Sequence, residues 1–134
     1  LYGLRNPTAR ADQLLAEEGL QAVAQRRAGG FSRGMAQRLS IARARVHAPA
    51  LLLLDEPFTG LDEPAAQRLT ARLEILGSEG HGLVLVTHAI NRAARLAQSA
   101  LILVGGAVRH RSLGGRLTES GLQAAYSQAL DTAQ

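Results

Sequence analysis

Two adjacent carboxylates follow the most apolar stretch of this 134-residue sequence. Asp55 and Glu56 come directly after four consecutive leucines, Leu51–Leu54, and Pro57 follows them. In phosphoryl transfer to water, one carboxylate can hold Mg²⁺ beside the phosphates while a second accepts the proton of the attacking water. An Asp-Glu pair at the end of a strand meets both demands. The alternative is a solvated acidic pair in a turn.

The elements on either side predict an open α/β sheet. Four leucines without alternation predict a strand at Leu51–Leu54 that is buried on both faces, as in a parallel sheet covered by helices. A second apolar strand is expected at Leu83–Val86, with His88 shortly after it. Between them we expect a helix over Glu63–Leu76, capped by Asp62. In such sheets the reactive groups gather at the carboxyl ends of the strands.

The remaining segments predict further helices and one hairpin. A helix should begin near Ser32, because Met35, Leu39, Ala42 and Val46 recur at helical spacing, and Pro49 should mark its end. Upstream, Leu14–Val23 predicts short helices broken at Gly19. The expected elements downstream are a short helix at Asn91–Ala97, a hairpin of Ala100–Val104 and Ala107–His110 around Gly105-Gly106, and a helix within Thr118–Leu130.

Composition narrows the classes of function. The hydrophobic content of 46% is that of a globular domain, and no apolar run approaches the length of a membrane-spanning helix. There is no cysteine, which suits a cytoplasmic protein. All fifteen basic residues are arginine, so the Lys of a phosphate-binding loop is not among them. The net charge of +4 is scattered, and no nucleic-acid partner is expected.

Several segments carry a family resemblance. Phe31–Met35 (Phe-Ser-Arg-Gly-Met), followed by Gln37–Ala44, resembles the signature motif of ABC ATPases. Leu51–Glu56 looks like the Walker B strand with its catalytic glutamate, Thr59–Asp62 like the D-loop, and Thr87-His88 like the switch histidine. The order and the spacings are those of the family, and the match is dense from residue 31 to residue 88.

The resemblance implies a role for each matching residue. It implies Glu56 and His88 as catalytic residues, Asp55 as the Mg²⁺ residue acting through water, and Ser32, Arg33, Gly34, Met35 and Asp62 as nucleotide-binding residues. In the family the signature segment reaches the γ-phosphate held by the opposite subunit, and the D-loop crosses the interface. The start of a helix, with free N–H groups, suits an anion. Arg33 and Met35 depart from the usual glycine and glutamine, a variant familiar among exporter subunits.

The implied fold is an incomplete one. The chain resembles part of a P-loop NTPase of the ABC type, α/β with a mainly parallel sheet and flanking helices, lacking the phosphate-loop strand that would lie between Leu83–Val86 and Ala100–Val104. The expected divisions are residues 1–48 (helical subdomain with signature helix), 49–112 (second half of the ATPase core) and 113–134 (helical extension). Leu1–Leu4 resembles the subdomain segment that follows the Q-loop.

The implied function is that of an ATP-binding and ATP-hydrolysing subunit of an ABC transporter, which uses ATP and Mg²⁺. Its expected partners are a second nucleotide-binding subunit and transmembrane permease subunits, and its expected location is cytoplasmic, peripheral on the inner face of the cell membrane. Exporter type is expected, with a faint likeness to haem exporters, and the chain alone is expected to be inactive. The alternatives are a soluble ABC ATPase acting on ribosomes or DNA, and a non-catalytic relic.

Overall fold

A computed structural model describes residues 5–115 and 117–132 of the chain. It divides into two compact units, Leu1–Val86 and Thr87–Gln134. The divisions expected from the sequence, after residues 48 and 112, stay predictions. The resemblance noted at Leu1–Leu4 lies outside the described residues.

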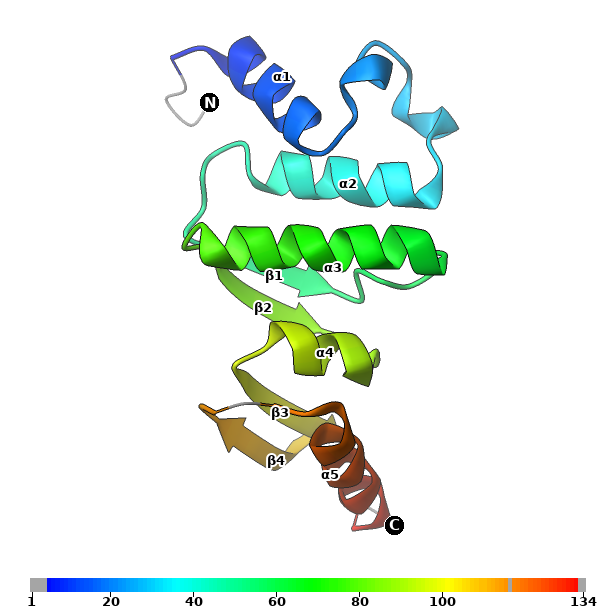
Figure 1. Ribbon diagram of the computed structural model, residues 1–134, viewed down its shortest axis with the longest axis vertical. Helices are drawn as coiled ribbons and strands as arrows, with labels where there is room; N and C mark the ends of the chain where they lie inside the picture. Colours follow the sequence, from blue (N-terminus) through cyan, green and yellow to red (C-terminus); the bar gives the residue numbers. More distant parts are fainter. Residues whose placement is uncertain (1–4, 116, 133–134) are drawn as a thin grey trace. The chain divides into compact units, whose positions relative to one another are not determined.

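The described residues of the first unit form three α-helices and a two-stranded sheet (Figure 1). Its elements are α1 (Pro7–Glu17), the 3₁₀ turns η1 (Gln21–Val23) and η2 (Ala28–Gly30), α2 (Arg33–Ala44), β1 (Leu51–Asp55), α3 (Glu63–Ser78) and β2 (Gly82–Val86). Helices α2 and α3 run side by side, and their N-termini lie at the same end. The first residues of α2 and α3 therefore share one end of the unit.

Helix α1 begins earlier than the sequence pattern indicated. Pro7 occupies its first turn, and the Asn6 side chain accepts a hydrogen bond from the Ala9 N–H at 3.1 Å, which caps the helix before the leucine pattern starts. The expected break at Gly19 is confirmed. Gly19 has a φ of +66°, a left-handed conformation that glycine adopts without strain.

The two predicted N-caps are confirmed. Ser32 Oγ accepts from the Met35 N–H at 3.2 Å, and Asp62 Oδ1 accepts from the Ala65 N–H at 2.8 Å. Each side chain satisfies an N–H that its helix cannot pair internally. Pro49 does not end α2: the helix stops at Ala44, several residues earlier, and the chain then turns.

Strands β1 and β2 pair in parallel, as expected, with Leu52 opposite Leu83 and Leu54 opposite Leu85. Helix α3 covers one face of this sheet (Figure 1). Its apolar stripe is buried as the pattern predicted, at Ala66, Leu69, Leu73 and Leu76.

The prediction that Leu51–Leu54 is buried on both faces is wrong. Leu52 is 4% exposed, whereas Leu51 and Leu53 are 52% and 72% exposed. Alternate residues of a strand point to opposite faces, and within the described residues α3 covers only the face to which Leu52 points.

A charged cluster joins the three helices of the first unit. Arg45 Nη1 lies 2.8 Å from Glu17 Oε2 and 3.3 Å from Glu18 Oε1. Arg72 binds the same two oxygens, with Nη2 at 3.0 Å from Glu17 and Nε at 2.8 Å from Glu18. The Glu18 and Arg45 side chains are buried. Each carboxylate thus contacts both guanidinium groups.

The cluster shifts two pKa values. Burial raises the pKa of Glu17, but the hydrogen bond and charge of Arg45, with contributions from Gln13 and Arg72, outweigh it, so that the pKa lies below its ordinary value. Burial lowers the pKa of Arg72, but the hydrogen bond to Glu18 and the surrounding carboxylates outweigh it and raise that pKa. Both shifts favour the charged forms.

The second unit is an antiparallel hairpin with two helices. Its elements are α4 (Ile90–Leu96), β3 (Ser99–Val104), β4 (Ala107–Leu113) and α5 (Glu119–Asp131). Gly105 and Gly106 both have positive φ, at 59° and 76°, as the predicted two-residue turn requires. Leu122 and Ala129 of α5 are buried, and α5 contacts α4, β3 and β4. All three predicted elements of this unit are confirmed.

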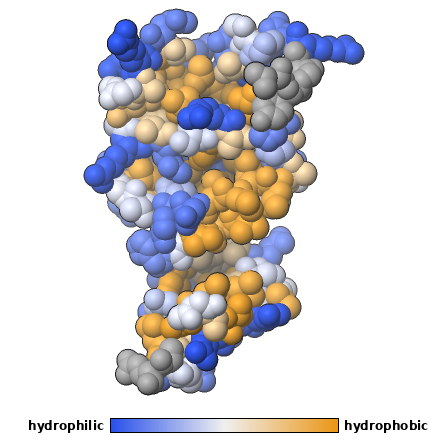
Figure 2. All heavy atoms as spheres, turned by 180° about the vertical axis from the view of Figure 1, so that it is seen from behind, coloured by the Kyte–Doolittle hydropathy of each residue, from blue (hydrophilic) through white to orange (hydrophobic). Residues whose placement is uncertain are grey.

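Each sheet leaves one face apolar and exposed. On the first sheet the exposed side chains are Leu51, Leu53, Val84 and Val86; on the second they include Leu101, Leu103 and Val108. Figure 2, the view from behind, shows hydrophobic residues gathered in patches on the surface. Strands β2 and β3 belong to different sheets. Among the described residues, no helix is long and apolar enough to cross a membrane.

Candidate functional site

The signature segment opens helix α2. Ser32 is its cap, and Gly34 and Met35 lie in its first turn. The Ser32 hydroxyl accepts a hydrogen bond from the Met35 N–H at 3.2 Å, and the Gly34 carbonyl accepts one from Arg38 Nε at 3.3 Å. An anion at this helix start would meet N–H groups and the positive end of the helix dipole.

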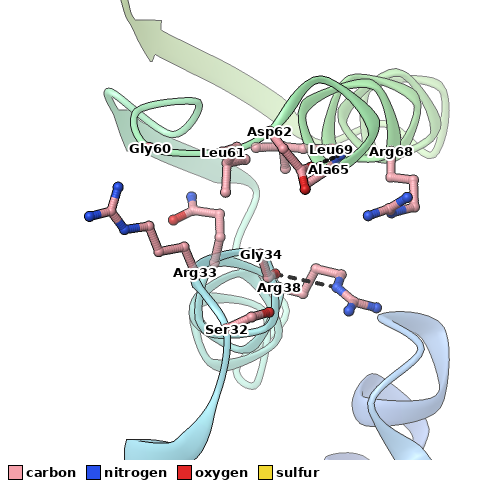
Figure 3. A pocket seen from close by; sticks show the side chains of 11 residues that line it. Ser32, Arg33, Gly34, Arg38, Gly60, Leu61, Asp62, Ala65, Arg68 and Leu69 are labelled. Carbon is pink, nitrogen blue, oxygen red and sulfur yellow. Dashed lines mark hydrogen bonds between the residues drawn. The ribbon is translucent and has the colours of Figure 1, made fainter.

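A pocket of about 250 Å³ lies between the start of α2 and the start of α3 (Figure 3). The α2 side contributes Ser32, Arg33, Gly34, Gln37 and Arg38. The D-loop and α3 side contributes Gly60, Leu61, Asp62, Ala65, Arg68 and Leu69. The structure therefore brings together two segments that the sequence analysis had singled out separately. Met35 is not among the lining residues.

Arg33 and Gly60 approach each other across this pocket. Gly60 has a φ of +74°, and a Cβ added there would clash with Arg33 Nη1 and lie 3.2 Å from Arg33 Cδ. The arginine that departs from the usual signature glycine therefore lies along the backbone of the D-loop segment. Glycine at position 60 meets two demands, a left-handed backbone and a close neighbour.

Three long polar side chains of the pocket were missed as site residues by the sequence analysis. Arg68 reaches it from the second turn of α3, and Gln37 and Arg38 reach it from α2. Arg38 Nη1 also donates to the Glu18 carbonyl at 2.8 Å, so it braces the turn after α1. The spacing of Gln37 and Arg38, one helical turn after Arg33 and Gly34, was a signal for them. Arg68 carried no such signal.

Asp55 and Glu56 lie at the carboxyl end of β1. Asp55 is exposed and pairs in register with Val86. Glu56 has a φ of +43°, an uncommon conformation for a non-glycine residue. It is fixed from both sides: its N–H donates to the Val86 carbonyl at 2.8 Å, and the Thr59 hydroxyl donates to its Oε2 at 3.3 Å. Strained residues held this firmly cluster at functional sites.

His88 belongs to the second compact unit, just after β2. Its side chain is exposed, and its carbonyl accepts from the Ile90 N–H at 3.0 Å at the start of α4. Its place beside Glu56 stays a prediction. Within the described ranges, no three acidic, histidine or cysteine side chains form a group that could hold a metal. The expected roles of Asp55 toward Mg²⁺ and of Glu56 as the base stay predictions.

Comparisons with known proteins agree on a family. The family model for ABC transporters matches residues 5–59. The molybdenum import ATP-binding protein ModC of Saccharophagus degradans is 41% identical over 123 residues, covering 90% of this chain and 33% of that protein. The Nod factor export ATP-binding protein I of Neorhizobium galegae is 44% identical over 87 residues, 65% of this chain and 25% of that protein.

A solved structure agrees with the fold. The ATP-binding subunit of an ABC transporter superposes with a TM-score of 0.75 at 30% identity, covering 96% of this chain and 57% of that one. The chain spans a quarter to a third of the length of the two curated relatives.

The comparisons correct one expectation. The exporter type, and the haem exporter in particular, is not supported, because ModC and the relatives for phosphonates and aliphatic sulfonates are named as import proteins. The ATP-binding and P-loop NTPase character is supported by the family model, the relatives and the solved structures together. The chain is similar, over most of its length, to part of the ATP-binding domains of ABC transporters.

Proposed function

We propose that this chain forms part of an ATP-binding subunit that couples ATP hydrolysis to transport through separate membrane subunits. The observation that carries the proposal is the pocket that joins the signature segment to the D-loop segment. Its walls combine the N-terminus of α2 with Arg33, Arg38 and Arg68. This is a setting that attracts phosphate. The relatives are named for transport, which favours a transporter over a soluble ATPase.

At the end of β1, Asp55 and Glu56 would divide the work on the phosphate and the water. ATP would supply the phosphoryl group, and Mg²⁺ would supply the positive charge that neutralises the phosphate oxygens. Asp55, exposed at the strand end, would hold the ion through water. Glu56 would accept the proton of the attacking water. The Thr59 hydroxyl supports this assignment, because its hydrogen bond to Oε2 orients the carboxylate.

The other site residues act on the phosphate or across an interface. Ser32 and Gly34 would donate to the γ-phosphate bound by a second ATP-binding subunit, with Arg33 and Met35 placed beside them. Asp62 would reach across the same interface while it caps α3. His88 would contact the γ-phosphate and report its presence to Glu56. The phosphate-binding Lys would come from outside these 134 residues, which contain none.

The partners follow from the same proposal. A second ATP-binding subunit would complete the site. Permease subunits in the membrane would respond to the conformational change that ATP hydrolysis causes, so the protein would work at the cytoplasmic face of that membrane. Hydrolysis by the chain alone is not expected. The direction of transport is left open, since relatives named for import and for export both match.

Mixed dimers of complete subunits test the assignment of the signature segment. One protomer carries Gly34→Asp, which places a carboxylate where the γ-phosphate should dock. We expect hydrolysis to fall at the site that contains the other protomer's phosphate-binding loop, by at least about tenfold given the charge repulsion. Nucleotide binding by the mutant protomer's own loop should be retained.

The matched control is Gly77→Asp, an exposed glycine near the end of α3 where an added Cβ would meet only Leu83 Cδ1, at an ordinary contact distance of 3.8 Å. It should leave both sites active. If Gly34→Asp weakens nucleotide binding by its own protomer and spares the partner site, the trans arrangement is wrong.

A further inference from the structure

The buried charges that join α1, α2 and α3 are more elaborate than stability alone requires. Glu17 and Glu18 each contact both Arg45 and Arg72, at 2.8 to 3.3 Å. Buried ion pairs seldom stabilise more than apolar packing of the same volume would. Among the described residues, Arg45 Nε has no hydrogen-bond partner, which is a further cost of this arrangement. When each carboxylate binds both guanidinium groups, however, the hydrogen bonds fix the relative positions of the segments that carry them.

We propose that this charged cluster is a positioning device that sets how α2 lies against α3, with Glu18 and Arg45 as its positioning residues. Arg45 caps the C-terminus of α2, and Arg72 lies on α3, so Glu18 and Glu17 hold the two helices together at that end. The pocket lies at the other end, where Ser32 and Asp62 cap the same two helices.

Because α2 is long, a small change of its tilt at the cluster produces a large displacement at the pocket. The 12 residues of α2 lie between Ser32 and Arg45, which are therefore about 20 Å apart along the helix at 1.5 Å per residue. A tilt of about 5° at the cluster would move Ser32 by about 2 Å, which is enough to misplace a group that must contact a reacting phosphate. Figures 1 and 3 show the parallel helices and the pocket between their N-termini.

The significance of this inference for catalysis depends on the proposed function, but its test does not require nucleotide. A Cβ at Gly34 would lie 3.4 Å from the Cβ of Ala65, across the pocket, close to the separation of about 3.5–4.5 Å that a disulfide needs. The chain contains no cysteine, so Gly34→Cys with Ala65→Cys gives a reporter free of background. With oxidised glutathione as the oxidant, its rate of disulfide formation in the whole chain measures how closely α2 approaches α3 at the site.

Two changes at the cluster are compared in this reporter chain. Arg45→Lys keeps the charge but replaces the planar fork by a single ammonium, which cannot hold both carboxylates in the same geometry. Glu18→Leu with Arg45→Leu removes one acid and one base together and leaves the Glu17–Arg72 pair, 3.0 Å apart, in place. This double change should fold with little loss of melting temperature, because apolar residues replace a buried pair of opposite charges.

The matched control is Glu79→Gln, which changes an exposed carboxylate 3.8 Å from Arg45 Nη2 at the margin of the cluster. We expect disulfide formation to slow about threefold or more in both cluster variants, given its dependence on Cβ separation. The control should react at the parent rate. Parent rates in the double variant, with its melting temperature preserved, would overturn the inference and leave the proposed function standing. Loss of the trans effect of Gly34→Asp would overturn the function and leave this inference standing.

Discussion

At the scale of single residues, Glu56 combines an unusual backbone with a defined environment. Its φ of +43° is held by the Val86 carbonyl, and its carboxylate receives the Thr59 hydroxyl. A non-glycine residue in this conformation is strained, and the strain persists because two neighbouring segments fix it. A carboxylate held in this way is suited to receive a proton from one direction.

In a complete subunit that contains this chain, Glu56→Gln should lower ATP hydrolysis by at least about 10²-fold, the usual effect of losing a general base. The amide keeps the shape of the side chain but does not accept the proton, so ATP binding should remain. Steady-state turnover and nucleotide binding are measured side by side. Unchanged turnover would place the base elsewhere.

Gly60 should tolerate no side chain. Gly60→Ala places a Cβ in the left-handed region, which costs about 1–2 kcal/mol, and forces Arg33 to move. Denaturant unfolding of the chain gives the total loss. Arg33→Ala in the same background serves as the control, because it should recover the part due to contact and leave the backbone part. If Arg33→Ala recovers nothing, the two residues do not press on each other.

At the scale of elements, the helix caps and the charged cluster hold α2 and α3 by different means. The caps act within three residues of sequence: Ser32 reaches Met35, and Asp62 reaches Ala65. The cluster acts across 27 to 55 residues, from Glu17 and Glu18 to Arg45 and Arg72. The caps and the cluster can therefore be tested separately, the caps by urea unfolding and the cluster by the pH dependence of the melting temperature.

Removal of a cap should destabilise the chain moderately. Asp62→Ala leaves the Ala65 N–H without its acceptor, and the free energy of unfolding should fall by about 1 kcal/mol. Asp62→Asn keeps an oxygen in place and should lose much less. Urea unfolding midpoints of the two variants are compared with the parent. Equal losses would mean that the charge of Asp62, and not its hydrogen bond, matters.

The charged cluster predicts a pH dependence. The pKa of Glu17 lies below its ordinary value of 4.5 in the folded chain, so its contribution is complete above that value and is lost as the pH falls through the lower folded pKa. Melting temperatures between about pH 6 and pH 3 should decline less steeply for Glu17→Gln. Asp12→Asn, an exposed carboxylate on the same helix outside the cluster, should follow the parent curve. A Glu17→Gln curve parallel to the parent would contradict the assignment.

At the scale of the whole molecule, each of the two sheets exposes an apolar face to solvent, which is unfavourable unless another segment packs against it. Leu53, Val84 and Val86 on the first sheet and Leu101 and Leu103 on the second are exposed to 48% or more. Strand β2 pairs with β1, and β3 pairs with β4, in separate sheets. The strand expected between β2 and β3 in the family's sheet stays a prediction. It would pair with the open edges of these two strands, and the segments joined to it would cover the exposed faces.

A polypeptide that carries the phosphate-binding strand of a relative should therefore bind this chain. The two should co-purify, hydrogen exchange should slow at the open edges of β2 and β3, and ATP with Mg²⁺ should raise the melting temperature of the complex by linkage. The same polypeptide with its phosphate-loop Lys changed to Ala is the control, which should bind the chain but respond weakly to ATP. Slow exchange at both edges in the chain alone would refute the missing-strand account.

The sequence alone determined the features that depend on interactions between residues close together in the chain. The caps at Ser32 and Asp62, the break at Gly19 and the buried stripe of α3 were all predictable, since they depend on hydrogen bonds within three residues or on helical spacing. The place of the two carboxylates at the end of β1 was predictable from the apolar run before them. Local pattern therefore suffices to place the elements, whereas the roles of the candidate site residues were named from the family resemblance.

Only the tertiary structure decided which distant segments meet. The exposure of Leu53, the approach of Arg33 to Gly60 and the place of Arg68 in the pocket depend on how α3 packs against its neighbours. The charged cluster likewise unites residues as far apart as Glu17 and Arg72, and no local pattern marks such a pair. The physical reason is that burial and ion pairing reward contacts between surfaces, and those surfaces exist only once the chain has folded.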